Sequence, residues 1–298
     1  MRLVLQKVNR LVRPSSKLNH LTTHSNPLTN LVKSFSTKPS LRMRVVPVPV
    51  RSDNYAYLLI DDKTNTAAVV DPYDPEKVMK MASQEKVELS GTILTTHHHE
   101  DHSGGNAEFQ KRMGDHCKVY GGSNQIPKLT NKVGDKDQFK IGEDIQVTCL
   151  ATPCHTQDSI CFYIEDVKKN QRGVFTGDTL FVSGCGRFFE GTPEEMDHAL
   201  NKQLGSLPSD TITYVGHEYT KSNVAFSASI EPKNQAILKL KEFCQSNSVT
   251  TGKFTIGDEK NFNVFMRLNE PEVIKSTDMK SEIDVMKKLR EMKNSFKG

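Results

Sequence analysis

The sequence predicts a layered α/β fold followed by a smaller, mainly helical region. Between residues 43 and 217, short apolar stretches rich in β-branched residues alternate with helix signals, a pattern typical of strands and helices packed in layers. Beyond that point the apolar residues recur at helical spacing, in residues 231–246 and 282–296. We therefore expect two domains, residues 43–217 and residues 218–298, preceded by a segment of different character, residues 1–42.

Helix and strand signals alternate along the first of these domains. A helix is predicted over residues 75–85, because Asp74 can cap its start and Pro75 occupies the first position, where a missing N–H is harmless. Further helices are expected after Gly105 and over residues 193–204. The predicted strands are, in chain order, residues 45–50, 55–60, 67–70, 92–96, 119–120, 145–150, 160–164, 174–176 and 211–215.

The net positive charge of the chain comes from its beginning. The whole chain has a formal net charge of +4 at pH 7, yet ten lysines and arginines precede Asp53, the first acidic residue. Without them, 30 basic residues face 36 acidic ones, so residues 53–298 carry a balance of −6. A mildly acidic body argues against a nucleic-acid partner. No apolar stretch approaches the roughly 20 residues that cross a bilayer, which argues against a membrane partner.

The first segment has the features of a mitochondrial transit peptide. Its apolar residues fall on one helical face and its basic residues around the other, no acidic residue interrupts it, and a Ser/Thr/Asn-rich stretch follows. We expect cleavage near residue 36 and delivery to the mitochondrial matrix, while Met43 offers a second start for a cytosolic form. A basic tail without a targeting role is the alternative. Charges within the apolar stretch disfavour a secretory signal.

The six cysteines are predicted to be free, buried thiols. None belongs to a Cys-x-x-Cys pair, and the sequence lacks the secretory context in which disulfides form. Cys154 stands beside a candidate metal ligand, but we expect it to pack in the core rather than to tune that ligand.

A cluster of metal-ligand side chains follows the predicted strand over residues 92–96. His97 and His99 stand two positions apart at a strand end, so both imidazoles face the same way and His98 points elsewhere. Asp101 and His102 follow in the turn and can reach a second position. Four ligand-type residues within six positions, combining imidazole with carboxylate, predict a site for first-row divalent metal ions.

Three further ligand candidates follow strands later in the chain. His155, Asp178 and His217 each follow an apolar, strand-like stretch. Because open sheets place their sites at one edge, beyond the strand ends, these residues are expected to meet the first cluster. The set supplies ligands for two divalent ions. Zinc is the expected metal, although iron and manganese also suit histidine and aspartate.

The order of these residues resembles the metallo-β-lactamase superfamily, whose fold is an αβ/βα sandwich with the metal site at one edge of the sheets. Within it, the chain resembles the glyoxalase II branch, also called hydroxyacylglutathione hydrolase. The resemblance implies that residues 43–217 form the catalytic sandwich and residues 218–298 a helical, glutathione-binding domain. The resemblance to this branch rests on segments that contain the ligands and on segments elsewhere in the chain. They are residues 53–55, 70–72, 94–106, 150–156, 175–186, 216–220 and 265–267.

The resemblance also implies a ligand set and a reaction. The ligands are His97, His99 and His155 for the first ion, Asp101, His102 and His217 for the second, and Asp178 as a bridge between them. Asp101 and Asp178 would position the hydroxide shared by the two ions, which attacks the thioester carbonyl. The implied reaction hydrolyses S-(2-hydroxyacyl)glutathione, chiefly S-D-lactoylglutathione, to glutathione and D-lactate. It is the second step of methylglyoxal detoxification.

The implied substrate contacts lie around the metal site and on the last helix. They are Arg187, Phe189, Tyr219, Arg290 and Lys293. Lysine is common in the family at position 187 and tyrosine at position 189. Arginine can still pair with a carboxylate of glutathione, whereas phenylalanine lacks the hydroxyl donor. From spacing alone, Arg290 and Lys293 would form a solvated helix face. The expected partner is a small glutathione thioester, and the protein is expected to be a monomer.

The nearest alternative is a mononuclear iron persulfide dioxygenase of the same superfamily, which shares the opening histidine motif. After Gly-Cys-Gly-Arg those enzymes resemble Thr-Asp-Phe-Gln, whereas this chain continues with Phe-Phe-Glu-Gly, residues 188–191. They also lack the helical end that carries Arg290 and Lys293. A non-catalytic binding protein would have lost ligands, and the acidic body disfavours a nuclease. No Gly-x-Ser-x-Gly elbow supports a serine hydrolase.

Overall fold

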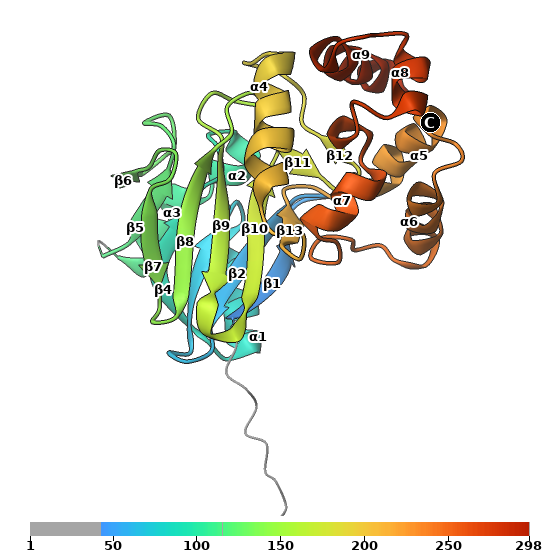
Figure 1. The fold of residues 1–298 in the computed structure, drawn as a ribbon. Helices are drawn as coiled ribbons and strands as arrows, with labels where there is room; N and C mark the ends of the chain where they lie inside the picture. Colours follow the sequence, from blue (N-terminus) through green and yellow to red (C-terminus); the bar gives the residue numbers. More distant parts are fainter. Residues whose placement is uncertain (1–42, 115, 298) are drawn as a thin grey trace, which may run out of the picture. The chain divides into compact units, whose positions relative to one another are not determined.

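Two sheets packed face to face form the body of the protein (Figure 1). The computed structural model describes residues 43–114 and 116–297, so the predicted transit peptide lies outside the described residues. The first sheet has the strand order β1 (Met43–Pro49), β2 (Tyr55–Asp61), β3 (Thr66–Val70), β4 (Glu88–Leu94), β5 (Lys118–Gly121) and β6 (Asn131–Lys132). Its first three strands are antiparallel neighbours, and β3 to β6 run parallel.

The second sheet pairs strands from the middle of the chain. Its strand order is β13 (Ile212–Val215), β10 (Gln171–Gly177), β9 (Ile160–Asp166), β8 (Ile145–Ala151) and β7 (Gln138–Ile141). β13 lies parallel to β10, and the other neighbours are antiparallel. A separate two-stranded hairpin, β11 (Leu180–Phe181) and β12 (Gly184–Cys185), follows β10.

Strand β2 shows how the sequence builds the layers. Successive side chains of a strand point to opposite faces, and every residue of β2 is buried. Tyr57 and Leu59 point between the two sheets, where they share one hydrophobic cluster with Phe162 of the second sheet. Leu58 and Ile60 point to the outer face, into the cluster beneath the helices. A strand buried on both faces predicts a sheet covered on both faces, as observed.

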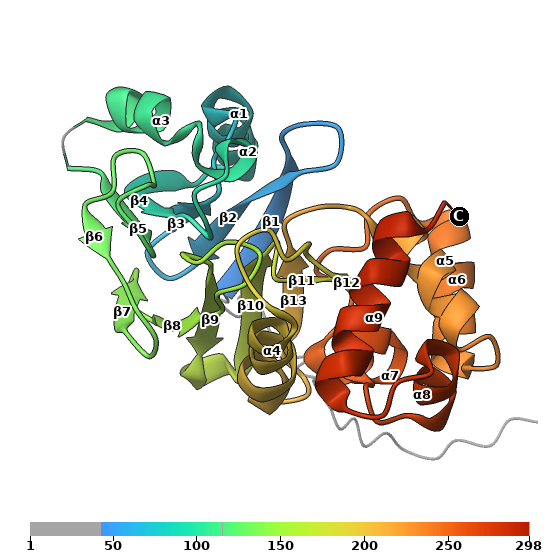
Figure 2. The ribbon, with the colours of Figure 1, turned by 90° about the horizontal axis from the view of Figure 1, so that it is seen from above.

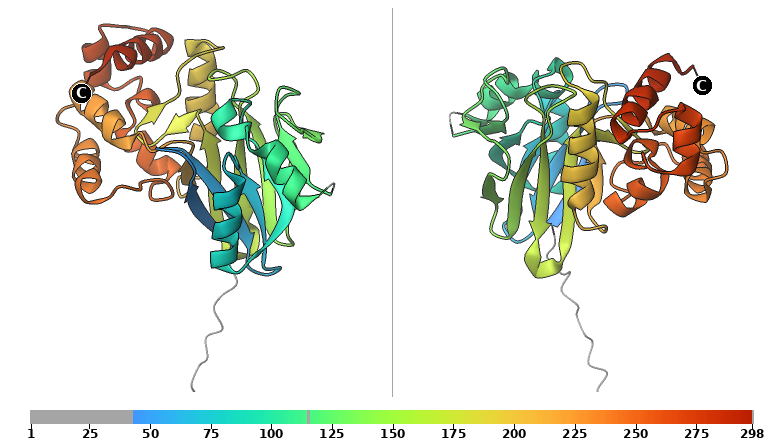
Figure 3. Two further views of the ribbon diagram at one scale, coloured as in Figure 1. Left: turned by 180° about the vertical axis from the view of Figure 1, so that it is seen from behind. Right: turned by 45° about the horizontal axis from the view of Figure 1, so that its top comes forward.

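Helices cover the outer face of each sheet. On the first sheet lie α1 (Pro75–Glu85) and α3 (Asn106–Met113), with Val78 and Phe109 buried beneath them (Figure 3, left). On the second sheet lies α4 (Pro193–Asp197), which continues through the π-helical turn η2 (His198–Gln203) and the 3₁₀ turn η3 (Leu204–Ser206) (Figure 2). The layers are therefore helix, sheet, sheet, helix.

A group of helices follows β13 and lies beside the hairpin and the second sheet (Figure 2). It consists of α5 (Thr220–Ile230), α6 (Gln235–Ser246), α7 (Ile256–Phe262), η4 (Val264–Met266), α8 (Pro271–Thr277) and α9 (Glu282–Ser295). Their apolar side chains share one hydrophobic cluster with the hairpin and with α4. We refer to these elements as the helical region. No helix among the described residues is long and apolar enough to cross a membrane.

The predicted α/β sandwich with a helical end is confirmed, and so are several local predictions. α1 begins where expected, with Asp74 accepting a hydrogen bond from the Lys77 backbone N–H. All six cysteines are free and buried. The strand predicted over residues 92–96 is wrong in its bounds, because β4 ends at Leu94 and begins at Glu88. The predicted helix over residues 193–204 is α-helical only as far as Asp197. The spacing of apolar residues could not predict that the rest of this segment forms the π-helical turn η2 and the 3₁₀ turn η3.

Candidate metal centre

The candidate ligands lie in four segments that follow strands at one edge of the two sheets. These segments follow β4, β8, β10 and β13, and they carry His97 to His102, His155, Asp178 and His217 respectively. The first of them includes the short helix α2 (Glu100–Ser103), on which Asp101 and His102 lie. His97 and His99 lie in the loop after β4 rather than on a strand, so strand alternation does not account for their common direction. The loop is instead held by the Thr96 backbone, which donates to Asp71 Oδ1 and accepts from the Ile160 N–H.

Three imidazole nitrogens converge at the first position. His97 Nε2 lies 3.0 Å from His99 Nδ1, and His155 Nε2 lies 3.1 Å from the same atom. Two nitrogens bound about 2.0–2.1 Å from a tetrahedral ion stand about 3.4 Å apart. The spacing of the three nitrogens is therefore close to that of a set sharing one ion.

The second position is formed by Asp101, His102 and His217. The Nε2 atoms of His102 and His217 are 3.3 Å apart, and Asp101 Oδ2 lies 3.5 Å from His217 Nε2. The donor atoms of these three residues all lie within 4.8 Å of one another. Two nitrogens and a carboxylate oxygen form a second set suited to a first-row divalent ion.

Asp178 lies between the two sets. Its Oδ2 is 3.4 Å from His155 Nε2 and 3.4 Å from His217 Nε2, while its Oδ1 is 3.3 Å from His102 Nε2. Oδ1 is buried and accepts no hydrogen bond among the described residues. A Cβ at Gly216 would collide with this oxygen, so only glycine leaves room for it. A buried carboxylate whose two oxygens face three imidazoles, one of them without a hydrogen bond, fits the place of a bridging metal ligand.

At the first position, the electrostatics leave the lone pairs of the imidazole rings available to a metal ion. Burial lowers the pKa of His97, His99 and His155, so these rings are neutral at pH 7 and can donate to a metal. Burial disfavours the charge of Asp178 too, but the neighbouring His102 and His217 outweigh it and hold the carboxyl pKa well below its usual range. Asp178 is therefore ionised, as a ligand must be.

Residues that the sequence reasoning did not assign fix the orientation of the rings. His102 Nδ1 lies 2.9 Å from Asp71 Oδ2, and His217 Nδ1 lies 2.8 Å from Asp53 Oδ1. His155 Nδ1 faces the backbone carbonyl of Arg187 at 3.0 Å. Such partners set the tautomer so that the other nitrogen points at the metal. The signal was present, because Asp71 follows β3 and Asp53 precedes β2 within segments that carried the family resemblance.

Two further polar residues support this arrangement. Asn54 Nδ2 donates to Asp101 Oδ2 at 2.9 Å and so holds that carboxylate beside His217. His98 points away from the ligands, as predicted, with its Nδ1 2.9 Å from the buried carboxylate of Asp158.

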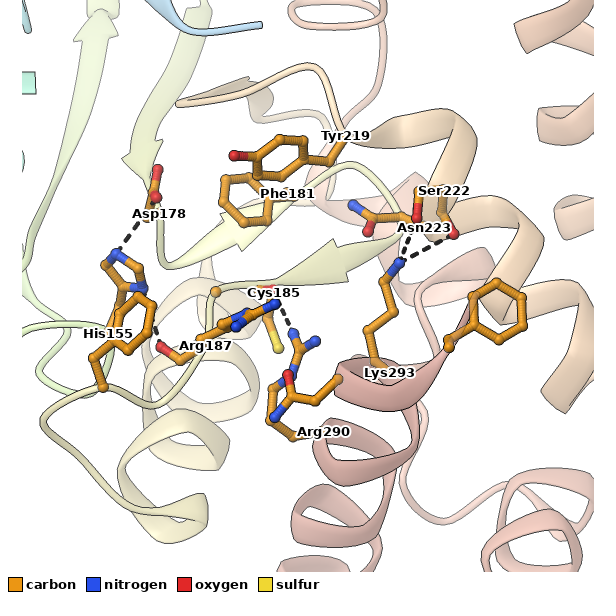
Figure 4. A pocket seen from close by; sticks show the side chains of 14 residues that line it. His155, Asp178, Phe181, Cys185, Arg187, Tyr219, Ser222, Asn223, Arg290 and Lys293 are labelled. Atoms are coloured by element: carbon orange, nitrogen blue, oxygen red, sulfur yellow. Dashed lines mark hydrogen bonds and ion pairs between the residues drawn. The ribbon is translucent and has the colours of Figure 1, made fainter. Parts of the chain in front are cut away.

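A pocket of about 440 Å³ leads from the ligand cluster to the helical region (Figure 4). Asp178 and His155 lie at one end of it, and Lys293 and Ser222 at the other. All five predicted substrate residues line the pocket, namely Arg187, Phe189, Tyr219, Arg290 and Lys293. The structure therefore brings together every residue that the sequence reasoning placed at the site.

The basic residues of the last helix differ from a solvated face. Arg290 is only 7% exposed, and its guanidinium donates to the Cys185 carbonyl at 3.0 Å. Lys293 is half-buried, and its ammonium donates to the hydroxyl of Ser222 at 2.7 Å. Burial and the charge of Arg290 lower the pKa of Lys293 to about 8. The alternative of a solvated face is wrong for Arg290, because helix spacing alone could not show that the hairpin packs over it.

Two aromatic side chains stand beside the ligands. Tyr219 stacks on His217, with ring centroids 4.6 Å apart and an interplanar angle of 11°. Phe189 is 60% exposed, and its ring centroid lies 5.2 Å from that of His155 and 5.8 Å from that of His99. They place apolar surface beside both predicted metal positions.

Comparison with known proteins places the two parts of the chain in described families. Residues 51–217 match the model of the metallo-beta-lactamase superfamily. Residues 218–296 match the model described as hydroxyacylglutathione hydrolase C-terminus. The first match defines the class of protein to which the sandwich and its histidine-rich edge belong.

Relatives in other organisms narrow this class. A Schizosaccharomyces pombe protein described as "probable hydroxyacylglutathione hydrolase glo2" is 52% identical over 247 residues, covering 82% of this chain and 94% of that protein. The cytoplasmic hydroxyacylglutathione hydrolase of Arabidopsis thaliana is 42% identical, covering 86% of this chain and 100% of that protein. The cytoplasmic isozyme of Saccharomyces cerevisiae is 44% identical, with coverage of 81% and 94%. The chain belongs to the hydroxyacylglutathione hydrolase family.

Among solved structures, ETHE1 from Myxococcus xanthus has a TM-score of 0.58 and 25% identity, covering 85% of this chain and 90% of that chain. A metallo-beta-lactamase from Staphylococcus aureus has a TM-score of 0.59 and 22% identity, covering 84% of this chain and 67% of that chain. These likenesses concern the sandwich fold. Both structures are less similar in sequence to this chain than the hydroxyacylglutathione hydrolases, which are 42–52% identical to it.

Proposed function

We propose that the chain hydrolyses S-(2-hydroxyacyl)glutathione, chiefly S-D-lactoylglutathione, to glutathione and D-lactate. The observation that carries this proposal is one continuous pocket with metal-ligand side chains at one end and three basic side chains along the rest. A thioester carbonyl can lie near Asp178 while the carboxylates of a glutathione tripeptide lie near Arg187, Arg290 and Lys293. The names and the extent of the matches to relatives support the same substrate class.

The proposed metal content is two divalent ions, with zinc as the expected metal. The first ion would be held by His97, His99 and His155, the second by Asp101, His102 and His217, with Asp178 contacting both. When bound, such a pair supplies a water molecule of lowered pKa and a Lewis acid for the carbonyl oxygen. The unpaired Asp178 oxygen and the converging imidazole nitrogens support this ligand set.

The chain's own residues would arrange the reaction. Asp178 and Asp101 would position the attacking water, since Asn54 fixes the Asp101 carboxylate through one oxygen. Phe189 and Tyr219 would shield the reacting end from bulk solvent. The basic residues would anchor the glutathione part. A glutathione thiolate, with a free-thiol pKa of about 8.5, leaves without strong acid assistance.

The persulfide dioxygenase alternative needs only one iron. It would leave Asp101, His102 and His217 gathered around a position that no ion uses, although His102 and His217 are almost completely buried. This observation favours the two-ion hydrolase.

We also propose residues 43–217 and 218–298 as the two functional domains, a monomeric state, and a mitochondrial matrix location after cleavage near residue 36. A cytosolic form would begin at Met43. The acid-free, amphipathic sequence of the first segment supports the location.

The deciding experiment measures hydrolysis of S-D-lactoylglutathione by the purified protein, with metal content determined on the same sample. A second arm supplies glutathione persulfide and follows oxygen uptake. A third compares Lys293→Ala with Lys288→Ala, which removes the same charge from the same helix outside the pocket. Thioester turnover with two metals per chain, and a KM raised by Lys293→Ala alone, is the expected result. Oxygen uptake with one iron and no thioester turnover would overturn the proposal.

A further inference from the structure

A buried carboxyl group lies behind the β11–β12 hairpin, away from the pocket and the ligands. Glu259 of α7 is completely buried, at 0% exposure. Its Oε2 accepts hydrogen bonds from the Ser183 backbone N–H at 3.0 Å and from Asn263 Nδ2 at 2.9 Å. Its Oε1 is buried and accepts none among the described residues. Burial raises the pKa of this carboxyl to about 8, so it is largely neutral at pH 7.

Glu259 belongs to a polar network that binds the backbone of the hairpin turn to the helical region. Side chains of the helical region donate to the turn carbonyls, and the two serine hydroxyls bond to each other. The bonds are Asn263 Nδ2 to the carbonyls of Gly184 (3.0 Å) and Phe181 (3.4 Å), Asn223 Nδ2 to the carbonyl of Val182 (3.2 Å), and Ser183 Oγ with Ser227 Oγ (2.9 Å). The turn is therefore held from behind by side chains rather than by a neighbouring strand.

The conformation of the turn needs this support. Ser183 has a φ of 58°, in the left-handed region that residues other than glycine rarely adopt. Such a conformation costs about 1–2 kcal/mol and persists only where the surroundings over-determine it. Glu259 accepts the N–H of this residue directly, so it stabilises the least favourable backbone position of the hairpin.

The hairpin in turn connects the two ends of the site (Figure 4). Asp178 stands two positions before the start of β11, and the Phe181 ring meets His217 edge-on at a centroid distance of 5.9 Å. After the turn, the Cys185 carbonyl accepts from Arg290, and the Arg187 carbonyl faces His155 Nδ1. A shift of the turn would therefore move the predicted bridging ligand and the wall of the pocket together.

We propose that Glu259 is a positioning residue: by holding the Ser183 turn, it sets the placement of Asp178 in the ligand cluster and of the hairpin wall of the pocket. Its kinetic consequence rests on the proposed function, whereas its consequence for metal binding does not. Glu259 touches no predicted ligand and no substrate contact, so it acts only through the hairpin.

The test compares three variants of the metal-loaded protein. Glu259→Leu removes the hydrogen-bond acceptor and puts an apolar side chain of similar size in its place. Glu259→Gln keeps an oxygen that can accept from Ser183 and Asn263, and therefore serves as the conservative rescue. Glu231→Leu is the matched control, because Glu231 is also buried in the helical region, pairs with Arg267 at 2.8 Å and makes no contact with the hairpin. Each is measured for unfolding temperature, kcat, KM and metal retention against a chelator, well below the unfolding temperature.

Loss of a group hydrogen-bonded to a metal ligand typically lowers affinity or activity by 10–100-fold, and Glu259, which acts one step further out through the hairpin, is expected at the lower end of that range. We expect Glu259→Leu to lower kcat and metal retention by about tenfold, Glu259→Gln to stay within about threefold of wild type, and Glu231→Leu to lose stability only. Equal kcat and metal retention in Glu259→Leu and Glu231→Leu would overturn the inference. If the wild type hydrolyses no glutathione thioester, the proposed function fails, and metal retention alone still decides the role of Glu259.

Discussion

At the scale of single residues, Asp178 has the largest predicted effect, because it faces both ligand sets. Asp178→Asn should lower kcat by more than about a hundredfold, since even outer partners of metal sites account for 10–100-fold. It should also lower the metal content. The control is Asp197→Asn, which changes another buried aspartate, one that accepts from Asn201 and lies outside the ligand cluster. Near-normal turnover with two bound metals in Asp178→Asn would contradict the bridging role.

Lys293 gives a prediction for pH dependence. Burial and the charge of Arg290 lower its pKa to about 8, so the side chain is a cation below that pH and neutral above it. A neutral amine no longer attracts a glutathione carboxylate. We expect KM for the thioester to rise about tenfold from pH 7 to pH 9, after subtraction of spontaneous hydrolysis, with kcat unaffected by this group. Lys293→Arg should abolish the rise, because arginine stays charged. The same rise in Lys293→Arg would assign it to another group.

At the scale of elements, the cap of α1 tests how independently the helices of the sandwich contribute. Asp74→Ala removes the acceptor for the Lys77 N–H and should cost about 1 kcal/mol, a shift of about 2–4 °C in unfolding temperature. Kinetics should not change, since α1 covers the outer face of the first sheet. Lys80→Ala, exposed on the same helix, is the control. A change in kcat would show that α1 supports the site.

The contact between α7 and the hairpin predicts a pH dependence of stability. The pKa of Glu259 is raised from 4.5 to about 8 in the folded state, so between these values the folded protein binds more protons than the unfolded chain. The stability that this group contributes is complete below about pH 4.5 and is lost as the pH rises to about 8, at on the order of 1.4 kcal/mol per pH unit. Urea unfolding of wild type and Glu259→Gln should therefore diverge with rising pH, to the disadvantage of wild type. Parallel curves would show that Glu259 is ionised throughout.

At the scale of the whole molecule, the contrast between the basic first segment and the acidic residues 53–298 predicts the cellular location of the protein. Residues 1–36 fused to a reporter should direct it to mitochondria, and the chain beginning at Met43 should remain in the cytosol. Replacing Lys7, Arg10 and Arg13 by glutamate should abolish import, because the basic face of an amphipathic helix is the feature that marks the segment as a transit peptide. A full-length fusion found only in the cytosol would refute the assignment.

The sequence by itself determined what depends on residue type and short spacing. The continuous apolar run of β2, the cap of α1 and the ligand types placed after strands follow local rules. The layered fold and the candidate ligands could therefore be predicted. The tertiary structure places these ligands within reach of one another. The helices α5, α7 and α8 were not predicted, because their apolar residues show no clear helical spacing. Their buried side chains are identified only by the hydrophobic cluster that they share with the hairpin and β13.

Only the tertiary structure decided which side chains support the site. Asp53 meets His217 across 164 positions, Asp71 meets His102 across 31, and Glu259 meets Ser183 across 76. Arg290 is buried because the Cys185 carbonyl, 105 positions earlier, lies against it. A local pattern carries no information on such distant partners. Their positions are set by the packing of the two sheets and the helical region, which brings together residues that no spacing rule connects.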